Sequence, residues 1–214
     1  MPWKQYQALT GKEETVTKIG VLALQGAFIE HIGIIQQLGA LPLPIRLPDQ
    51  LKGLDGLIIP GGESSTLLKL MHSFGLFNVL RELVLDGLPI WGTCAGLICL
   101  GQTTSRHDEA TLAVMDINVK RNAFGRQTES FETDLDIPVL GDSLFKAIFI
   151  RAPAITKVGP MVEVLAKLHD DTITAARQEN MLATAFHPEL SGDFRFHQYF
   201  IREIITKRIK QRLT

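Results

Sequence analysis

Cysteine is scarce in this chain of 214 residues, which holds only two, Cys94 and Cys99. Two cysteines cannot build the disulfide framework of a small secreted domain, and no C-x-x-C spacing offers a metal or redox site. We therefore expect reduced thiols, a cytoplasmic setting and no metal site.

The sequence also lacks a strong charge of either sign, long apolar runs and a secretory signal. Its formal net charge of −1 argues against a nucleic-acid or anionic-membrane binder that depends on an overall field. No apolar run reaches the ~18–20 residues that a membrane-spanning helix needs. The polar segment 1–17 has no apolar centre of the kind found in signal peptides, so we interpret it as a flexible tail or a cloning remnant.

The remaining composition is that of a globular domain. Hydrophobic residues make up 45% of the chain, enough for a sizeable core, and ~100–200 residues is the usual length of a domain. Because no repeat, linker or low-complexity segment interrupts the chain, we expect a single domain over residues 18–214.

In the first half, short apolar runs alternate with segments of helical spacing. The apolar runs predict strands buried on both faces, at 19–24, 43–47, 56–60 and 88–91. The helical spacing predicts helices, at 28–38, 64–73, 76–86 and 95–100. This alternation favours a three-layer α/β fold, with an open, mostly parallel sheet and helices on both faces.

Beyond about residue 110 the pattern changes to short alternating segments. These predict a few antiparallel or edge strands, at 113–119, 127–133, 146–150, 161–166 and 172–177. The apolar segment 181–186 predicts one more buried strand. An amphipathic helix is expected over 194–211, and we interpret its basic end as a solvated face that suits the helix dipole.

The segment GTCAG at 92–96 has the form of a nucleophile elbow, a sharp turn from strand to helix, with cysteine in the place of serine. Its two glycines leave room for a strained, closely packed turn. The sulfur of Cys94 would then lie at the first turn of a helix, where the dipole and unpaired N–H groups favour a thiolate. The N–H of Ala95 is a candidate oxyanion donor. The alternative is a small buried hydrophobe, which is what we expect of Cys99.

The segment His187-Pro188-Glu189 offers the base that a cysteine nucleophile needs, together with a group to orient that base. The residue before a proline is extended, and in an extended segment positions i and i+2 point the same way. We therefore expect the carboxylate of Glu189 to reach the imidazole of His187. Of the other histidines, His31 stays undecided, and surface or helix-face positions are expected for His72, His107, His169 and His197.

The segment PGGESS at 60–65 follows a predicted strand. It is either a glycine turn in which Ser64 or Ser65 caps the next helix, or a loop whose N–H groups face an anion. It does not match a phosphate-binding loop, and Gln25-Gly26-Ala27 lacks the three glycines of a dinucleotide site. In an open α/β sheet, this loop and the cysteine elbow both lie at the carboxyl ends of strands, where ligands bind.

Together these three elements resemble the class I glutamine amidotransferases, which release ammonia from glutamine with a Cys-His-Glu triad. Further stretches narrow the resemblance to the glutaminase subunits of pyridoxal phosphate synthase: GVLALQGAFIEH, IIPGGESS, WGTCAGLICL, RNAFGRQTESFE, FIRAP and FHPEL. The resemblance covers nearly the whole chain from about Ile19. It implies the flavodoxin-like fold of that class.

The resemblance also implies roles for individual residues. Cys94 is the implied nucleophile, and His187 and Glu189 complete the triad. The implied glutamine contacts are Gly62, Glu63, Ser64, Arg121, Ile150 and Arg151. The implied oxyanion or partner-interface positions are Gln25, Gly61, Gly62 and Ala95. For Arg121 and Arg151 the plainer alternative is a surface ion pair.

The substrate implied by the resemblance is L-glutamine, and no cofactor is implied. The implied partner is a separate synthase subunit that consumes the ammonia within a large hetero-oligomeric complex, where docking activates the glutaminase. Two other classes stay open: a hydrolase or peptidase acting on other amides, and a catalytically silent regulatory module. The intact triad speaks against the silent module.

Overall fold

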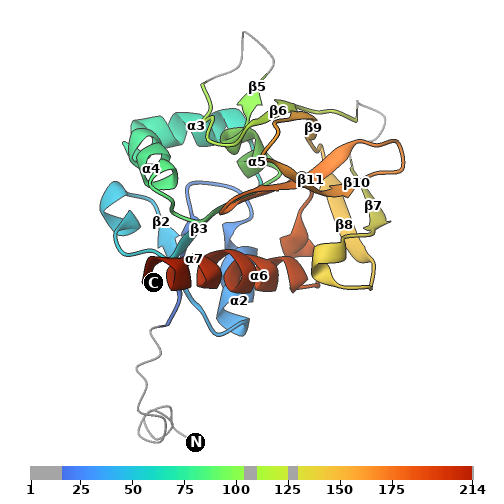
Figure 1. Cartoon of the computed structure of the whole chain (residues 1–214). Helices are drawn as coiled ribbons and strands as arrows, with labels where there is room; N and C mark the ends of the chain where they lie inside the picture. The colour runs from blue at the N-terminus through green and yellow to red at the C-terminus, as the bar shows by residue number, and fades with distance from the viewer. Residues whose placement is uncertain (1–15, 104–109, 125–129, 214) are drawn as a thin grey trace, which may run out of the picture.

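The computed structural model describes residues 16–103, 110–124 and 130–213 (Figure 1). The predicted tail at 1–17 lies almost entirely outside these residues. The first half of the chain contains four strands, β1 (Lys18–Leu22), β2 (Leu41–Ile45), β3 (Gly56–Ile59) and β4 (Ile90–Thr93). Between and after them lie α2 (Phe28–Gln37), the 3-10 turn η1 (Pro48–Leu51), α3 (Ser64–Ser73), α4 (Leu76–Leu85) and α5 (Ala95–Leu100).

The second half is richer in strands. They are β5 (Gln102–Thr103), β6 (Ile117–Lys120), β7 (Ser130–Leu135), β8 (Phe145–Ile150), β9 (Ala154–Val158), β10 (Glu163–Lys167), β11 (Ile173–Gln178) and β12 (Met181–Thr184). Two 3-10 turns, η2 (Pro138–Leu140) and η3 (Pro188–Leu190), lie among them. The chain ends in α6 (Arg195–Tyr199), the π-helical segment η4 (Phe200–Ile205) and α7 (Thr206–Leu213).

The main sheet has ten strands in the order β2-β1-β3-β4-β12-β11-β9-β6-β5, with β10 paired to β11. Its first five strands are all parallel, and their order is the 2-1-3-4-5 order of flavodoxin-like folds. Figure 1 shows α3, α4 and α5 on one side of this sheet and α2, α6 and α7 on the other. The predicted three-layer α/β fold is therefore confirmed.

Burial explains why the parallel strands could be predicted from the sequence. Every residue of β3, β4 and β12 is buried, as is all of β1 beyond its first residue, which requires continuous apolar runs. The antiparallel strands β11, β9 and β6 extend the sheet, and β7 pairs with β8 in a separate hairpin. This half matches the prediction of antiparallel strands.

Several predicted boundaries were wrong. The strand expected at 43–47 is β2 at 41–45, which includes Pro42 and Pro44; an edge strand tolerates prolines because one side forms no ladder. The strand expected at 88–91 lies at 90–93 and runs directly into Cys94. Of the strand expected at 113–119, only 117 onward is paired. The strand expected at 127–133 begins, within the described residues, at Ser130, and its first three positions lie outside them. Strands β5 and β9 were not predicted.

Candidate active site

Cys94 occupies a strained turn between β4 and α5. Its backbone dihedrals are φ 48° and ψ −101°, a conformation that a residue with a side chain rarely adopts. The turn packs so closely that a Cβ on Gly96 would lie 2.0 Å from the carbonyl oxygen of Ile59, and one on Gly92 would lie 2.5 Å from the backbone of Gly96. The segment therefore has the strand–turn–helix geometry that its pattern predicts.

The two cysteines lie in different environments. The Cys94 side chain is buried to 6% exposure and lies at the cleft described below, with its sulfur 3.8 Å from the carbonyl oxygen of Ile150. Cys99 is fully buried in α5, and burial raises the pKa of its thiol to about 12. A thiol of that kind is inert at neutral pH, as expected of a small core residue.

His187 and Glu189 are in direct contact. The Nδ1 atom of His187 lies 2.7 Å from Oε1 of Glu189, and both residues are buried. The route to this contact differs from the predicted one, because Glu189 lies in the 3-10 turn η3 rather than in an extended segment. Pro188 starts that turn, since its fixed φ suits the first position of a helix.

The surroundings of His187 favour its protonated form. Burial alone lowers the pKa of this imidazole, but hydrogen bonds with Cys94 and Glu189 and the charges of both groups outweigh burial and raise the pKa to about 10. A protonated imidazole beside a cysteine sulfur favours the thiolate. The arrangement therefore suits a nucleophile paired with a proton donor.

The loop after β3 lies against the loop after β1. The side-chain amide of Gln25 donates to the carbonyl oxygen of Glu63 and accepts from its N–H, both at 3.2 Å. A Cβ on Gly62 would lie 2.5 Å from Nε2 of Gln25, and one on Gly61 would lie 2.3 Å from Cε1 of His187. A side chain at either position would displace Gln25 or His187 from its place.

Glu63, rather than Ser64 or Ser65, caps α3, so that part of the sequence interpretation was wrong. Its longer side chain accepts hydrogen bonds from the N–H groups of Ser65 at 3.1 Å and Thr66 at 2.6 Å, while Ser64 is buried. The Thr66 hydrogen bonds, with those of Ser65 and the charge of Arg121, lower the pKa of Glu63 to about 2 against the opposing effect of burial. Arg121 reaches Oε1 of Glu63 at 3.2 Å and the Ser65 hydroxyl at 2.9 Å.

These loops surround one cleft of about 230 Å³, smaller than the roughly 300–1,000 Å³ of sites for drug-sized ligands. Its lining residues are Gly62, Glu63, Ser64, Cys94, Ala95, Ile98, Arg121, Asn122, Ile150, Arg151, Pro153 and His187. The size and the mixture of charges suit a substrate such as a single amino acid.

The cleft brings together all six positions expected to contact glutamine, together with Cys94 and His187. Glu189, Gln25 and Gly61 do not line it; Glu189 lies behind His187, and the other two shape the glycine loop. Sequence reasoning missed three lining residues, Ile98, Asn122 and Pro153. Ile98 follows Cys94 by four positions on a helix, and this spacing could have identified it.

Two histidines in the core were misjudged or left open. His197 was expected on a surface or helix face, but it is only 1% exposed, because it points from α6 toward the ring of Trp91. His31, which stayed undecided, is completely buried, and its Nδ1 atom lies 2.9 Å from Nε2 of His197. The exposed positions expected for His72 and His169 are confirmed, and His107 lies outside the described residues.

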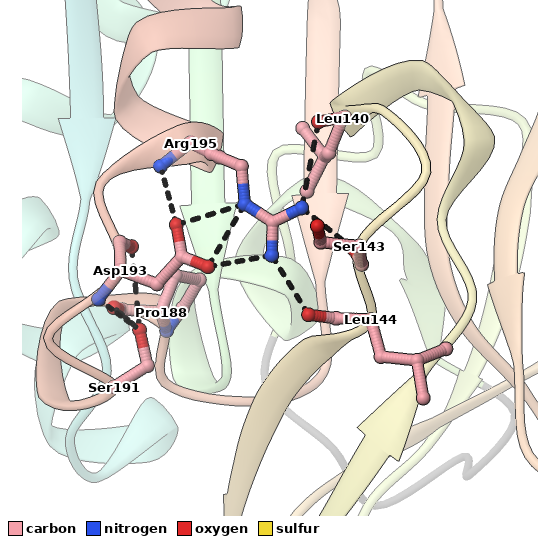
Figure 2. Close-up of polar contacts among 7 residues, drawn as sticks. All are labelled: Leu140, Ser143, Leu144, Pro188, Ser191, Asp193 and Arg195. Carbon is pink, nitrogen blue, oxygen red and sulfur yellow. Dashed lines mark hydrogen bonds and ion pairs between the residues drawn. The ribbon is translucent and has the colours of Figure 1, made fainter.

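Arg195 fastens the segment after the triad to the loop before β8 (Figure 2). Its guanidinium donates to both carboxylate oxygens of Asp193. It also donates to the backbone carbonyl oxygens of Ser143, Leu144 and Leu140, at distances of 2.6 to 3.5 Å. Strand β8 in turn accepts the N–H of His187 through the carbonyl oxygen of Ile148 at 2.8 Å. The elements that carry His187 and Ile150 are thereby held at a fixed spacing.

Within residues 16–103, 110–124 and 130–213, no group of three or more His, Cys, Asp or Glu side chains could hold a metal ion. The helices of the same segments are all too short or too polar to cross a membrane.

Comparison with known proteins adds independent evidence. The model of the SNO glutamine amidotransferase family matches residues 21–206. The pyridoxal 5'-phosphate synthase subunit PdxT of Dehalococcoides mccartyi is 54% identical over 187 residues, which are 86% of this chain and 96% of that protein. PdxT of Herpetosiphon aurantiacus is 55% identical over 186 residues, 86% of this chain and 98% of that protein. A crystal structure of a glutamine amidotransferase, 44% identical, matches with a TM-score of 0.82 and covers 88% of this chain and 98% of its own.

Proposed function

The chain belongs to the SNO glutamine amidotransferase family, and from that membership we propose that it is the glutaminase subunit of a pyridoxal 5'-phosphate synthase. It hydrolyses L-glutamine to L-glutamate and ammonia and passes the ammonia to the synthase subunit. The observation that carries the chemistry is the cleft that Cys94, on a strained elbow, and His187 line together.

In the first step, the thiolate of Cys94 attacks the carbon of the glutamine side-chain carboxamide. The carbonyl oxygen becomes an oxyanion, for which the backbone N–H groups of Gly62 and Ala95 are the proposed donors. Both residues line the cleft. One such donor is typically worth ~10²–10³ in rate, so the position of the glycine loop strongly affects turnover.

In the second step, His187 gives its proton to the departing nitrogen, the carbon–nitrogen bond breaks, and ammonia leaves a γ-glutamyl thioester on Cys94. The neutral imidazole then takes a proton from a water molecule as this water attacks the thioester carbon. Collapse of the second tetrahedral species breaks the carbon–sulfur bond, releases glutamate, and leaves the thiolate beside a protonated His187. Glu189 orients the imidazole throughout.

Charged side chains on the cleft wall support the choice of a free amino acid as substrate. Arg121 and Arg151 suit the α-carboxylate of glutamine, because a guanidinium matches a carboxylate in charge and geometry. Glu63, ionised above its lowered pKa of about 2, suits the α-ammonium. The ion pair between Arg121 and Glu63 lies on this wall, so it does not exclude a role of either side chain in binding glutamine.

The proposed partner is the synthase subunit, in a large hetero-oligomeric complex. This proposal rests on the subunit name of the PdxT relatives and on chemistry. Ammonia released into water is protonated, so a neighbouring acceptor is needed to use it.

The test measures glutamate and pyridoxal phosphate formed by this chain with a synthase subunit, a pentose phosphate, a triose phosphate and glutamine. Wild type should form both products. The variant Cys94→Ala should form neither from glutamine, yet should co-purify with the synthase and should leave pyridoxal phosphate formation from added ammonium salt intact. Cys99→Ala is the matched control and should behave like wild type.

Glutamate release by Cys94→Ala would refute the proposed chemistry. Glutamate without pyridoxal phosphate would leave the glutaminase standing and remove the proposed acceptor. Turnover of asparagine or of peptide amides at the rate of glutamine would favour the alternative of a general amide hydrolase.

A further inference from the structure

Behind the triad lie two buried histidines, of which His31 reaches toward the carboxylate of Glu189 and His197 contacts His31. The Nε2 atom of His31 lies 3.5 Å from Oε2 of Glu189 and the same distance from the hydroxyl of Thr93. On its other side, Nδ1 of His31 lies 2.9 Å from Nε2 of His197. His31 comes from α2 and His197 from α6, so 166 residues of chain separate the two rings.

The surroundings of these rings favour one pair of tautomers. Among the described residues, neither Oε2 of Glu189 nor Nδ1 of His197 has a hydrogen-bond partner at ordinary distance. If His31 carried its proton on Nδ1, its Nε2 lone pair would face the carboxylate, and His197 would bury an N–H without an acceptor. If His197 donates from Nε2 to Nδ1 of His31, then His31 keeps a proton on Nε2 and directs it at Glu189. The second arrangement avoids both penalties and leaves only the Nδ1 lone pair of His197 without a donor.

Both rings are neutral in this arrangement. Burial, with the nearby charges of His197 and His187, holds the pKa of His31 well below its ordinary value. Burial also lowers the pKa of His197 to about 3. A neutral His31 adds an N–H dipole next to Glu189 without adding a second positive charge that would compete with His187.

We propose that His31, held in its Nε2–H form by His197, is a positioning residue that anchors the free carboxylate oxygen of Glu189. The inference rests on the proposed glutaminase function and deepens it. One carboxylate oxygen binds Nδ1 of His187 at 2.7 Å, and the other faces the N–H of His31. A hydrogen bond from His31 to this second oxygen would hinder rotation of the carboxylate away from His187, and the imidazole would keep its orientation toward Cys94. Hydrogen bonds of this kind are often long in a resting site and shorten during catalysis.

Two amide substitutions separate the two contacts of His31. In His31→Gln the side-chain nitrogen reaches the place of Nε2, so the donor to Glu189 is kept while the contact with His197 is lost. In His31→Asn the shorter side chain reaches the place of Nδ1, so the contact with His197 is kept and the donor to Glu189 is lost. Each variant removes one hydrogen bond of the same buried residue, so the two serve as matched controls for folding.

Glutamate release is measured for both variants in complex with the synthase subunit. We expect His31→Asn to lower kcat by ~10–100-fold, the usual loss for a partner that orients a functional group. KM should not change, because His31 does not line the cleft. We expect His31→Gln to keep most of the wild-type kcat. Equal kcat values in the two variants, or a change confined to KM, would overturn the inference.

A second measurement does not depend on how the variants fold. Nitrogen-15 spectra of the histidine rings in the wild-type chain should show His31 protonated at Nε2 and bare at Nδ1. The Nδ1–H form would overturn the inference. If the wild-type complex releases no glutamate, the proposed function fails, and the ring spectra still decide the tautomer of His31.

Discussion

The substitution Gly96→Ala adds one methyl group where the elbow packs against β3. A Cβ on Gly96 would lie 2.0 Å from the carbonyl oxygen of Ile59 and 2.9 Å from its carbonyl carbon. Real Cβ atoms essentially never approach another atom more closely than 3.0 Å. Because the clashing atoms belong to the backbone of Ile59, a change of side-chain rotamer cannot relieve the clash. Helix α5 must therefore move away from β3 by about 1 Å or more.

The size of the effect follows from that displacement. Adding a group to a filled core typically costs ~1–3 kcal/mol, and in a chain of this length each kcal/mol lowers Tm by ~2–4 °C. We therefore expect a loss of about 2–12 °C in Tm. Because α5 begins immediately after Cys94, the sulfur moves with it, and a misplacement of ~1 Å can cost ~10²-fold in rate.

The assay pairs thermal unfolding of the isolated chain with glutamate release in the presence of synthase. The matched control is Gly33→Ala in α2, because a Cβ there would meet nothing within 4 Å. That variant should be neutral or stabilised by up to ~1 kcal/mol, as expected for alanine in place of helical glycine. If Gly96→Ala has the same Tm and kcat as wild type, the elbow is not as closely packed against β3 as described, and the reasoning is refuted.

Three further predictions follow from charged groups around the site. Glu189→Gln removes one of the charges that raise the pKa of His187 to about 10. The imidazolium is then lost at lower pH, so the alkaline limb of the pH profile of glutamate release should shift to lower pH. A limb that does not shift would contradict the pairing of His187 with Glu189. Glu63→Ala removes the cap of α3, worth ~0.5–2 kcal/mol. The pKa of Glu63 is lowered from 4.5 to about 2 in the folded chain. The stabilisation by the cap is therefore complete above pH 4.5 and is lost as the pH falls through about 2. The difference in Tm between wild type and variant should shrink over that range. Arg195→Lys loses the forked bonds to backbone carbonyls and should destabilise the chain by ~1–3 kcal/mol. Lys146→Met breaks an exposed ion pair and should leave Tm nearly unchanged. Equal Tm values for these two variants would argue against a role of Arg195 in holding the loop before β8.

The parallel half of the fold could be predicted because its strands are buried on both faces. The runs at 19–24 and 56–60 correspond to β1 and β3, and the helix expected at 64–73 is α3 to the residue. The spacing of apolar residues indicates which residues of a strand are buried, however, and does not indicate which strands pair. Strand β5 has only two residues, and the burial pattern of β9 does not alternate but changes from buried to exposed along the strand, so neither presents a period to identify.

The candidate site was predictable where function depends on local geometry. The glycines around Cys94 indicate a strained turn. Pro188 lies between His187 and Glu189 and gives these two residues the spacing that their contact requires. The contact between His31 and His197 was not predictable, because it joins two helices 166 residues apart. The positive φ angle of Arg151 also leaves no trace in residue type, whereas the asparagine at 122 is a residue that adopts a positive φ more often than most.

The central claim, that Cys94 is the nucleophile toward glutamine, is tested most directly by a reactive glutamine analogue. The diazoketone analogue of glutamine is added to the chain with its synthase partner, and the modified residue is located by peptide mass spectrometry. The account predicts one adduct per chain, on Cys94, that excess glutamine prevents and that Cys94→Ala abolishes. An adduct on Cys99, or no adduct while glutamate release continues, would contradict it.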